Sequence, residues 1–399
     1  TNGEVLQQIV DDFNASQDEI EIKAEYQGTY DDTITKLKAA MQSDSGLPDV
    51  CQMYDVGTKF MYDSGAVIPV EDKFESTGYD KSSVMEVISS YYTVDGKQYA
   101  MPFNVSTPML YYNKDVFEAA GLDPETPPTT YDEVLEDAKK IVESGAAPVG
   151  YSQAIYGWFF EQQLAGLGVT YGNNDNGRKE AVTAVDFDSN GGGLKVFDMW
   201  KKLYDSGYFE DYGTTTADTQ TAFFSGQVGM IIESTAILKN AVDSSPFEVG
   251  TGYLPRIEQN DEGGVIIGGG SLWLTDTGNE ANEDAAWKFI EYITTPDVQA
   301  KWSMGTGYFA INEKAYETDD MKAYLKENPN FETAINQLKD SPVNCNTAGV
   351  LSGVQTEARL TFNEIMPQVY DGKLTTQDAV DQLAASVNKA IENYNESIK

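Results

Sequence analysis

A short polar segment between Pro102 and Pro108 is the part of this sequence best suited to hold a ligand. Residues 104–107 read NVST, and the two prolines keep the backbone around them extended. The side chains there, Ser106 among them, have little to do within a helix or a strand and can bind a polar molecule. A segment that bears hydroxyls and joins two folded bodies is a natural place for a ligand cleft.

Arginine is the side chain best suited to bind an anion, and it is scarce here. The sequence holds Arg178, Arg256 and Arg359 against 64 acidic residues. Arg359 lies in a helical pattern, and two roles stay open for it: a salt bridge to one of the many acids, or a ligand for an anion. Tryptophans such as Trp158 can stack on a ligand, although a place in the core is the default for them.

Several catalytic chemistries are excluded by composition. The sequence has no histidine, which removes Ser-His-Asp and Cys-His catalysis and most catalytic zinc sites. The loop 172–177 has glycine where a calcium loop needs an acid, so we predict a surface turn. The glycine run 268–270 lacks the lysine of a phosphate loop, but a backbone amide beside Gly269 or Gly270 can still donate to an anion. We predict neither a metal nor a cofactor.

The overall composition is that of a globular protein with an acidic surface. The sequence has 399 residues, 41% hydrophobic and 23% charged, which predicts two or three compact units. Its net charge of −37 disfavours nucleic acid and anionic lipid as partners. The chain begins inside a helical pattern, so we expect a leader and a first strand to be missing. Cys51 fits a buried strand, and a disulfide with Cys345 stays open.

The elements that must position these residues alternate along the chain. We predict a helix ending near Phe13, a strand over 20–26, a helix from about 30 to 41, and a strand after Pro48. This order indicates an α/β layer with a largely parallel sheet. Residues 99–103 alternate like a half-buried strand, and residues 109–112 follow as a second, apolar strand.

The second body should begin with that strand. Thr130 and Glu133 form a capping-box pattern at the start of a helix, and the last helix begins after Thr375. The glycines at 268–270 predict a close passage of two backbones.

Four motifs in this order resemble those of the extracytoplasmic solute-binding proteins of ABC importers, family 1, along essentially the whole chain. They are DGKQYAMP (95–102), LYYNKD (110–115), FSGQVGM (224–230) and GTGY (305–308). Within the family, the sequence is most similar to members that bind sn-glycerol 3-phosphate. The shared segments are PFN (102–104), STP (106–108), AGLDPE (120–125), IIGG (266–269) and SLW (271–273).

The resemblance implies a fold and a role. The fold is α/β and two-lobed, of the type II periplasmic-binding-protein class, with a mostly parallel sheet flanked by helices in each lobe, a hinge and an interlobe cleft. The lobes would be 1–107 plus about 271–315, and 108–270 plus about 316–399. The implied protein is a monomer without enzymatic activity that delivers its ligand to ABC permease subunits. It would be extracytoplasmic, either periplasmic or anchored at the cell surface as a lipoprotein.

The resemblance also implies a set of ligand-binding residues. The phosphate-binding hydroxyls fall on Tyr30, Ser106 and Tyr308, and the phosphate-binding arginine falls on Arg359. The remaining positions are an acid for the glycerol hydroxyls, an aromatic floor, backbone amides and a further serine: Asp55, Trp158, Gly269, Gly270 and Ser234. An arginine fork with several hydroxyls can hold a phosphate without a metal.

Departures from the family pattern leave the ligand open. The family acid is glutamate, and Asp55 is one methylene shorter; the segment after Tyr308 reads FA where the family has a proline. A phosphodiester such as glycerophosphocholine therefore stays possible beside glycerol 3-phosphate. The alternatives are a mono- or oligosaccharide-binding protein of the same fold and, more remotely, a carboxylate-pair glycoside hydrolase.

Overall fold

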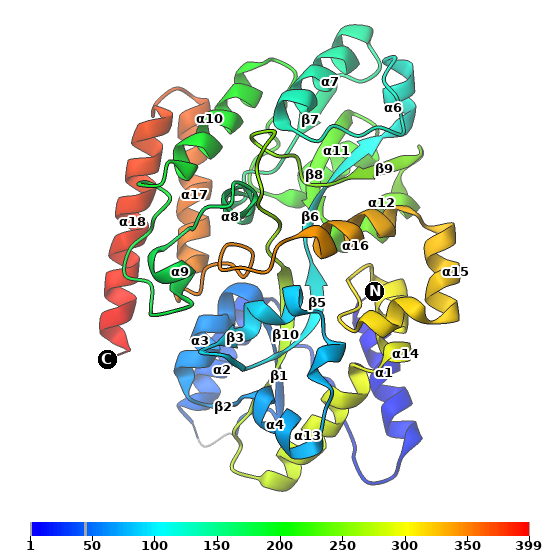
Figure 1. The fold of residues 1–399 in the computed structure, drawn as a ribbon, viewed down its shortest axis with the longest axis vertical. Coiled ribbons are helices and arrows are strands. Elements are labelled where there is room, and N and C mark those ends of the chain that lie inside the picture. Colours follow the sequence, from blue (N-terminus) through cyan, green and yellow to red (C-terminus); the bar gives the residue numbers. More distant parts are fainter. Residues whose placement is uncertain (1, 44–45, 399) are drawn as a thin grey trace. The chain divides into compact units, whose positions relative to one another are not determined.

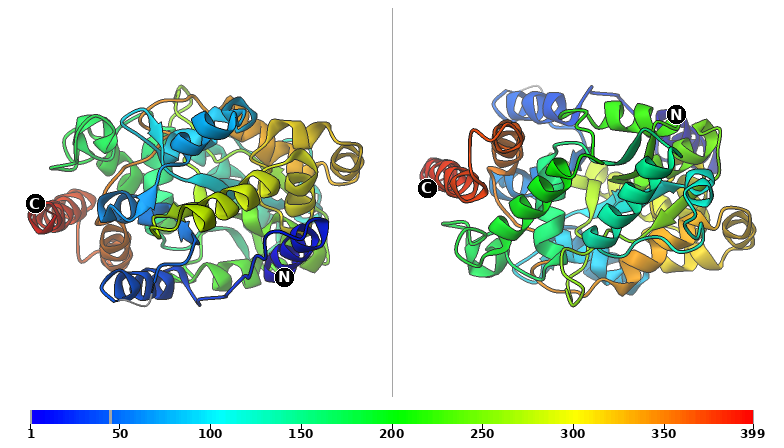
Figure 2. Two further views of the ribbon diagram at one scale, coloured as in Figure 1. Left: turned by 90° about the horizontal axis from the view of Figure 1, so that it is seen from below. Right: turned by 90° about the horizontal axis from the view of Figure 1, so that it is seen from above.

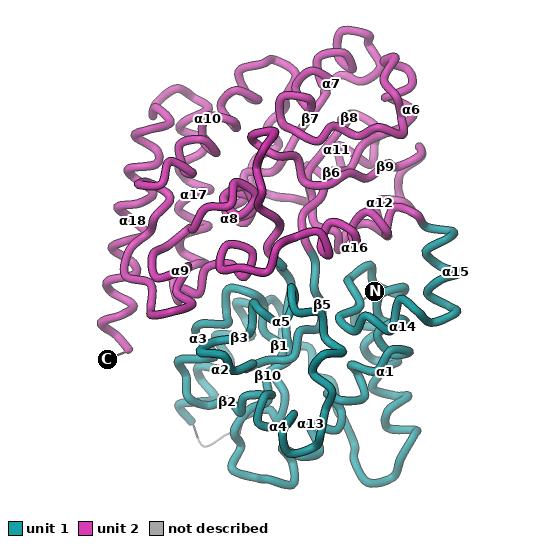
Figure 3. Tube along the Cα trace, in the orientation of Figure 1, with its two compact units in different colours: residues 1–106, 267–328 teal, residues 107–266, 329–399 magenta. Residues whose placement is uncertain are grey.

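Chain crossings at 106–107, 266–267 and 328–329 divide the computed structural model into two units (Figure 3). It describes residues 2–43 and 46–398. Unit 1 holds residues 1–106 and 267–328, and unit 2 holds residues 107–266 and 329–399. The second crossing precedes Gly269 and Gly270, which therefore belong to unit 1 rather than to the second lobe. The last crossing lies beyond 315, because Met321 is buried against Ala300 and Ala315 of unit 1.

Unit 1 is built around one long strand. β10 (Gly268–Thr275) pairs antiparallel with β1 (Val50–Tyr54), β2 (Val67–Ile68) and β5 (Met101–Ser106). A separate ribbon joins β3 (Thr93–Val94) to β4 (Lys97–Gln98). The helices of this unit are α1 (Asn2–Ser16), α2 (Tyr30–Met41), α3 (Thr58–Ser64), α4 (Val70–Thr77), α5 (Glu86–Ser89), α13 (Glu280–Ile293), α14 (Pro296–Thr306) and α15 (Asp319–Glu327).

Unit 2 has a sheet in the order β7-β8-β6-β9. Its strands are β6 (Pro108–Asn113), β7 (Val149–Ser152), β8 (Val228–Ser234) and β9 (Val249–Gly252). Its helices are α6 (Lys114–Ala119), α7 (Tyr131–Ser144), α8 (Gly157–Gly166), α9 (Asn173–Gly177), α10 (Gly192–Asp205), α11 (Thr216–Phe224), α12 (Leu238–Ser244), α16 (Asn330–Asp340), α17 (Gln355–Tyr370) and α18 (Thr376–Ser397). The long helices α17 and α18 run side by side (Figures 1 and 2).

Aromatic rings form the core of unit 2 where α8, α10 and α17 meet. The ring centroid of Phe362 lies 5.0 Å from Phe160 and 5.2 Å from Trp200. Local sequence signals set the helix starts, as predicted: Thr130 and Glu133 form the capping box of α7, and Thr375 caps α18. The core thus fixes α8 and α17 against each other, and these two helices carry Trp158 and Arg359.

The prediction of mostly parallel sheets is wrong. Among the ladders of the described residues, β7 and β8 pair parallel, whereas every ladder of β10 and both ladders of β6 are antiparallel. The reason lies in β10, which enters unit 1 from a distant part of the sequence and runs antiparallel to β1, β2 and β5. The local β-α order used for the prediction contains no information on this pairing.

The predicted strand at 20–26 is also wrong, because this segment is not in a ladder. Its backbone bonds instead to side chains at the end of α1 and directly after it. Asn14 both donates to the carbonyl of Ile22 and accepts from its amide, each at 2.8 Å. Gln17 makes the equivalent pair of bonds with Ile20. These side chains satisfy the groups that a neighbouring strand would otherwise pair.

Candidate functional site

The strand register of unit 1 brings several predicted ligand residues to one end of its sheet. Gly270 of β10 lies opposite Tyr54 on β1 and opposite Asn104 on β5, and Gly268 lies opposite Ser106. Asp55 follows β1 directly, in the 3-10 turn η1 (Asp55–Gly57), and is 5% exposed. β5 is buried along its whole length rather than half-buried as predicted.

Tyr30 joins this group from the first turn of α2. Thr29 and Asp32 form a capping box at this helix start, which fixes where the Tyr30 side chain leaves the chain. The Tyr30 ring stacks on Tyr54 at a centroid distance of 4.9 Å and an interplanar angle of 7°. Burial raises the pKa of Tyr30, a hydrogen bond with Asn104 partly opposes this rise, and the charge of Asp55 adds to it. Tyr30 therefore stays a neutral hydroxyl that can both donate and accept.

Asn104 connects the two tyrosines. Its Nδ2 donates to the Tyr30 hydroxyl oxygen at 2.8 Å, and its Oδ1 accepts from Gln52 Nε2 at 2.7 Å. Burial raises the pKa of Tyr308, and a hydrogen bond with Asn104 partly opposes this rise. Asn104 was not predicted as a functional residue. It lies within the polar segment at 104–107, but its role depends on tyrosines distant in the sequence.

Tyr308 is held by an aromatic stack and by the strand beside it. Its ring is parallel to Trp302, at 5.9 Å and 3°, and Trp302 stacks on Phe103 of β5 at 4.4 Å. Gly307 ends α14 in the left-handed region at φ 89°, which turns the chain back toward β5. The Phe309 amide then donates to the Val105 carbonyl at 3.0 Å.

The two glycines lie where a side chain has no room. A Cβ on Gly269 would lie 1.8 Å from the Asn104 carbonyl oxygen, and the φ of Gly269 is +95°. A Cβ on Gly270 would lie 2.6 Å from Asn104 Oδ1 and 3.1 Å from the Tyr30 hydroxyl. The close backbone passage predicted at 268–270 is therefore present. We call Tyr30, Asn104, Gly270 and Tyr308 the tyrosine cradle.

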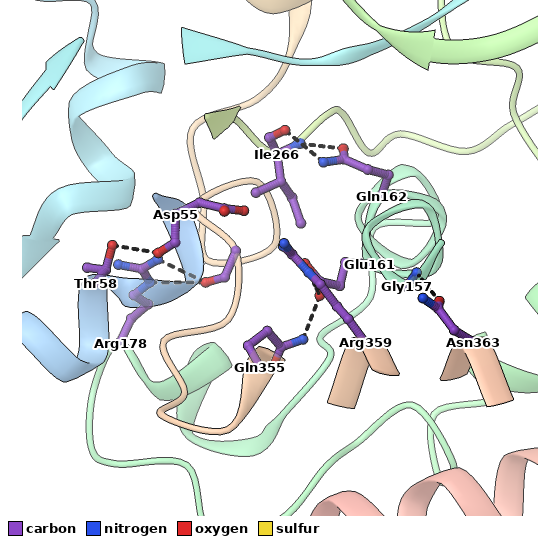
Figure 4. Close-up of polar contacts among 11 residues, drawn as sticks. Asp55, Thr58, Gly157, Glu161, Gln162, Arg178, Ile266, Gln355, Arg359 and Asn363 are labelled. Carbon is purple, nitrogen blue, oxygen red and sulfur yellow. Dashed lines mark hydrogen bonds and ion pairs between the residues drawn. The ribbon is translucent and has the colours of Figure 1, made fainter. Parts of the chain in front are cut away.

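Arg359 of unit 2 is part of a buried ion pair, one of the two roles that the sequence left open. Its Nε and Nη2 donate to the two carboxylate oxygens of Glu161, each at 2.7 Å (Figure 4). Gln355 Nε2 donates to the same carboxylate at 2.7 Å. Arg359 and Glu161 are only 9% and 5% exposed. Burial, followed by the charge of Glu161, raises the pKa of nearby Tyr171, which therefore stays neutral.

The start of α8 packs directly on the stem of Arg359. A Cβ on Gly157 would lie 2.5 Å from the Arg359 Cα and 2.9 Å from its Cγ. The Gly157 amide donates to Asn363 Oδ1 of α17 at 2.9 Å (Figure 4). The first contact leaves no room for a side chain at 157, so the backbone of α8 fixes the base of the arginine side chain.

The other predicted residues of unit 2 have structural contacts of their own. Trp158 is 5% exposed beside Tyr156 and Phe159, with ring centroids at 6.2 and 5.8 Å. Its buried indole nitrogen has no hydrogen-bond partner within 2–43 and 46–398. The Ser234 side chain caps the turn after β8 by accepting from the Ala236 amide at 3.2 Å. A role for either in ligand binding stays a prediction.

A cavity of about 690 Å³ lies elsewhere in unit 2 and contains none of the predicted ligand residues. It is lined in part by Tyr253, Arg256 and Gln337. The buried amide of Gln337 is already bonded to the Pro108 carbonyl and the Leu254 amide. Cavity size alone therefore does not indicate the ligand site of this protein.

Other expectations can be compared with the described part of the chain. Cys51 and Cys345 are both free thiols. No group of three or more potential metal-ligating side chains was found among the described residues. Of the helices in this part of the chain, none is both long and apolar enough to cross a membrane. Residues 172–177, predicted as a surface turn, contain the short element α9, in which Asn174, Asp175 and Asn176 have positive φ and Asn176 is buried.

Comparisons with known proteins match this chain over its length. A family described as bacterial extracellular solute-binding protein matches residues 8–333. The sn-glycerol-3-phosphate-binding periplasmic protein UgpB of Escherichia coli (strain K12) is 30% identical over 404 residues, which cover 100% of this chain and 91% of that protein. Among solved structures, UgpB from Mycobacterium tuberculosis in complex with glycerophosphocholine has a TM-score of 0.82 at 20% identity, covering 98% and 95% of the two chains. A cyclic alpha-maltosyl-1,6-maltose binding protein from Arthrobacter globiformis has a TM-score of 0.81 at 26% identity, covering 98% and 96%.

Proposed function

Since the chain belongs to the bacterial extracellular solute-binding protein family, we propose that it captures sn-glycerol 3-phosphate or a glycerophosphodiester and delivers it to an ABC permease. The observation that carries this proposal is the full-length relationship to UgpB, at 30% identity across 100% of this chain. The protein binds its ligand without converting it. It acts outside the cytoplasm as a monomer, in the periplasm or anchored as a lipoprotein.

The chemistry of the predicted residues supports a ligand with a phosphate and free hydroxyls. In unit 1, the tyrosine cradle offers neutral hydroxyls held in place by Asn104, and Asp55 offers a carboxylate that can accept from glycerol hydroxyls. Unit 2 carries Arg359, with Trp158 and Ser234 as further candidates. Neutral donors and one arginine can hold an anion without a metal.

A sugar ligand is the second candidate, and one observation favours it. The Arg359 guanidinium is already paired with Glu161, and this pair by itself carries no net charge for an anion to neutralise. The similarity to the structure of the maltosyl-maltose binding protein also supports a sugar ligand. Hydroxyl-rich cradles and tryptophans also suit sugars.

Titration calorimetry with sn-glycerol 3-phosphate, glycerophosphocholine and maltose tests the proposal. We expect saturable binding of at least one glycerol phosphate and none of maltose. Ser106→Ala, a change at the edge of the cradle, should weaken the phosphate ligand by roughly 10-fold if its hydroxyl contacts the ligand. Binding of maltose alone would overturn the proposal in favour of a sugar-binding protein.

Replacing Asn104 with alanine should weaken the ligand without a change of charge. The variant removes the donor to Tyr30 and leaves Gln52 without its acceptor, in a region where Asn104 is 3% exposed. We expect a loss of about 1–3 kcal/mol in the free energy of unfolding, and at least 10-fold weaker glycerol phosphate binding. Thermal unfolding and calorimetry measure the two effects. Unchanged affinity in a folded variant would show that the cradle does not contact the ligand.

A further inference from the structure

Glu161 lies where it can decide what charge the ligand may carry. Its two oxygens accept from Nε and Nη2 of Arg359, each at 2.7 Å, which is the bidentate geometry that a phosphate would also use. The pair is buried, and a buried pair is screened little by solvent. An anion that approaches Arg359 therefore meets the carboxylate as well as the guanidinium.

The surrounding contacts hold this arrangement in place. Gln355 Nε2 donates to Glu161 Oε1 at 2.7 Å, and Gly157 packs against the stem of Arg359. Gln162, the next residue on α8, is tied to the Ile266 backbone by two bonds of 2.8 Å (Figure 4). The helix turn that carries Glu161 is thus fixed on both sides. The carboxylate and the guanidinium act as one preformed unit with no net charge.

Two ligand classes differ in how they interact with such a unit. A phosphomonoester carries between −1.5 and −2 at neutral pH because its second pKa is near 6, whereas a phosphodiester carries a single charge. The second charge of the monoester gains little from this neutral unit, because Arg359 attracts it while Glu161 repels it. That second charge must still be taken out of water, and the diester, with a single charge, avoids this additional cost of desolvation.

We propose that Glu161 is a specificity-determining residue that makes this protein prefer a singly charged glycerophosphodiester over the doubly charged sn-glycerol 3-phosphate. The inference rests on the proposed function, since it requires a glycerol phosphate near Arg359. Glu161 acts through Arg359 and is a positioning residue for it.

The test is the ratio of dissociation constants for glycerophosphocholine and sn-glycerol 3-phosphate, measured by calorimetry at pH 7.5. We expect the wild-type protein to favour the diester. Glu161→Gln should shift the ratio toward the monoester by roughly 10- to 100-fold, because the carboxylate charge is gone. Glu161→Asp keeps the charge and should keep the preference, even where it weakens both ligands. Glu357→Gln, on the exposed first turn of α17, removes the same charge away from the pair and should change nothing.

A pH series distinguishes this role of Glu161 from a purely structural one, which would not make the ratio of dissociation constants depend on pH. Monoester binding to the wild type should strengthen relative to the diester between pH 7.5 and pH 5.5, as the monoester gains its second proton. Within unit 2, Tyr171 beside the pair stays neutral over this range, whereas the pKa of buried Glu233 is about 7. Protonation of Glu233 acts on the binding of both ligands, and dividing by the affinity for the diester removes this shared effect. In Glu161→Gln the same change of pH should weaken the monoester relative to the diester, because the charge that Arg359 then attracts without opposition is lost.

The outcomes separate the two proposals. A wild-type preference for the monoester, or an equal ratio in wild type and Glu161→Gln, overturns the role of Glu161 and leaves the proposed function standing. No binding of either phosphate ligand by wild type or variants overturns both. If thermal unfolding shows that Glu161→Gln does not fold, the test rests on the ratio in Glu161→Asp and on the wild-type pH series. A wild type that neither prefers the diester nor responds to pH overturns the role of Glu161 in specificity.

Discussion

Arg359→Met is expected to abolish binding of glycerol phosphates and to destabilise unit 2. The variant removes the bidentate donor for a phosphate and leaves the carboxylate of Glu161 buried without its arginine. Removing one partner of a buried ion pair costs about 3–5 kcal/mol. We therefore expect a lower unfolding temperature together with a dissociation constant raised by at least 100-fold, measured by thermal unfolding and calorimetry.

The double variant Arg359→Met/Glu161→Gln separates these two effects. It removes both charges, so most of the lost stability should return, because replacing a buried pair by neutral groups costs little. Phosphate binding should stay lost, since no guanidinium remains. Arg256→Met, an exposed position of the same unit, makes the same charge change as a control. Full phosphate affinity in either Arg359 variant would show that Arg359 does not contact the ligand.

Local sequence patterns predicted the helices better than the sheets. The capping residues Thr130 and Thr375 and the periodic apolar faces that follow them are contained within single helices, so the sequence alone defines α7 and α18. The direction of a strand pair is different, because it depends on a partner far along the chain. β10 joins the strands of residues 50–106 from residues 268–275, and nothing local indicates an antiparallel pairing.

For the candidate site as well, local features could be predicted from the sequence, whereas contacts between distant residues could not. The polar segment at 104–107 and the glycines at 268–270 were visible as unusual local chemistry. The partners were not: Glu161 is 198 positions away from Arg359 and is one of 64 acidic residues, so a specific pair between them is not predictable from composition or spacing. The role of Asn104 could likewise not be predicted, because it depends on a hydrogen bond to Tyr30, which is distant in the sequence. The resemblance to the family predicted which residues bind the ligand, and the structure shows the contacts that hold their side chains in place.

Glu233→Gln is expected to stabilise the protein at neutral and alkaline pH and to have little effect near pH 4.5. Glu233 is 5% exposed on β8, and burial raises its pKa from 4.5 to about 7, against hydrogen bonds from Gln220 Nε2 at 2.8 Å and the Ser234 amide at 2.6 Å. A raised pKa means that the folded state binds the proton more tightly than the unfolded state. The stability from this proton is therefore complete below about pH 4.5 and is lost as the pH rises to about 7.

The size of the effect follows from the same shift. A rise from 4.5 to about 7 corresponds to about 3 kcal/mol of unfolding free energy lost by the wild type across this range. Glutamine keeps the shape and can accept from the Ser234 amide while it donates to a flipped Gln220 amide, so the variant loses no pairing.

Urea unfolding of both proteins between pH 4.5 and 8 should give a stability difference that grows with pH to about 3 kcal/mol. Because 64 acidic residues titrate in the background, the difference between the proteins is the quantity to compare, and Glu118→Gln on the exposed face of α6 is the control. A difference that is constant with pH would mean that Glu233 has the same pKa in the folded and the unfolded protein, and that the two hydrogen bonds balance the effect of burial.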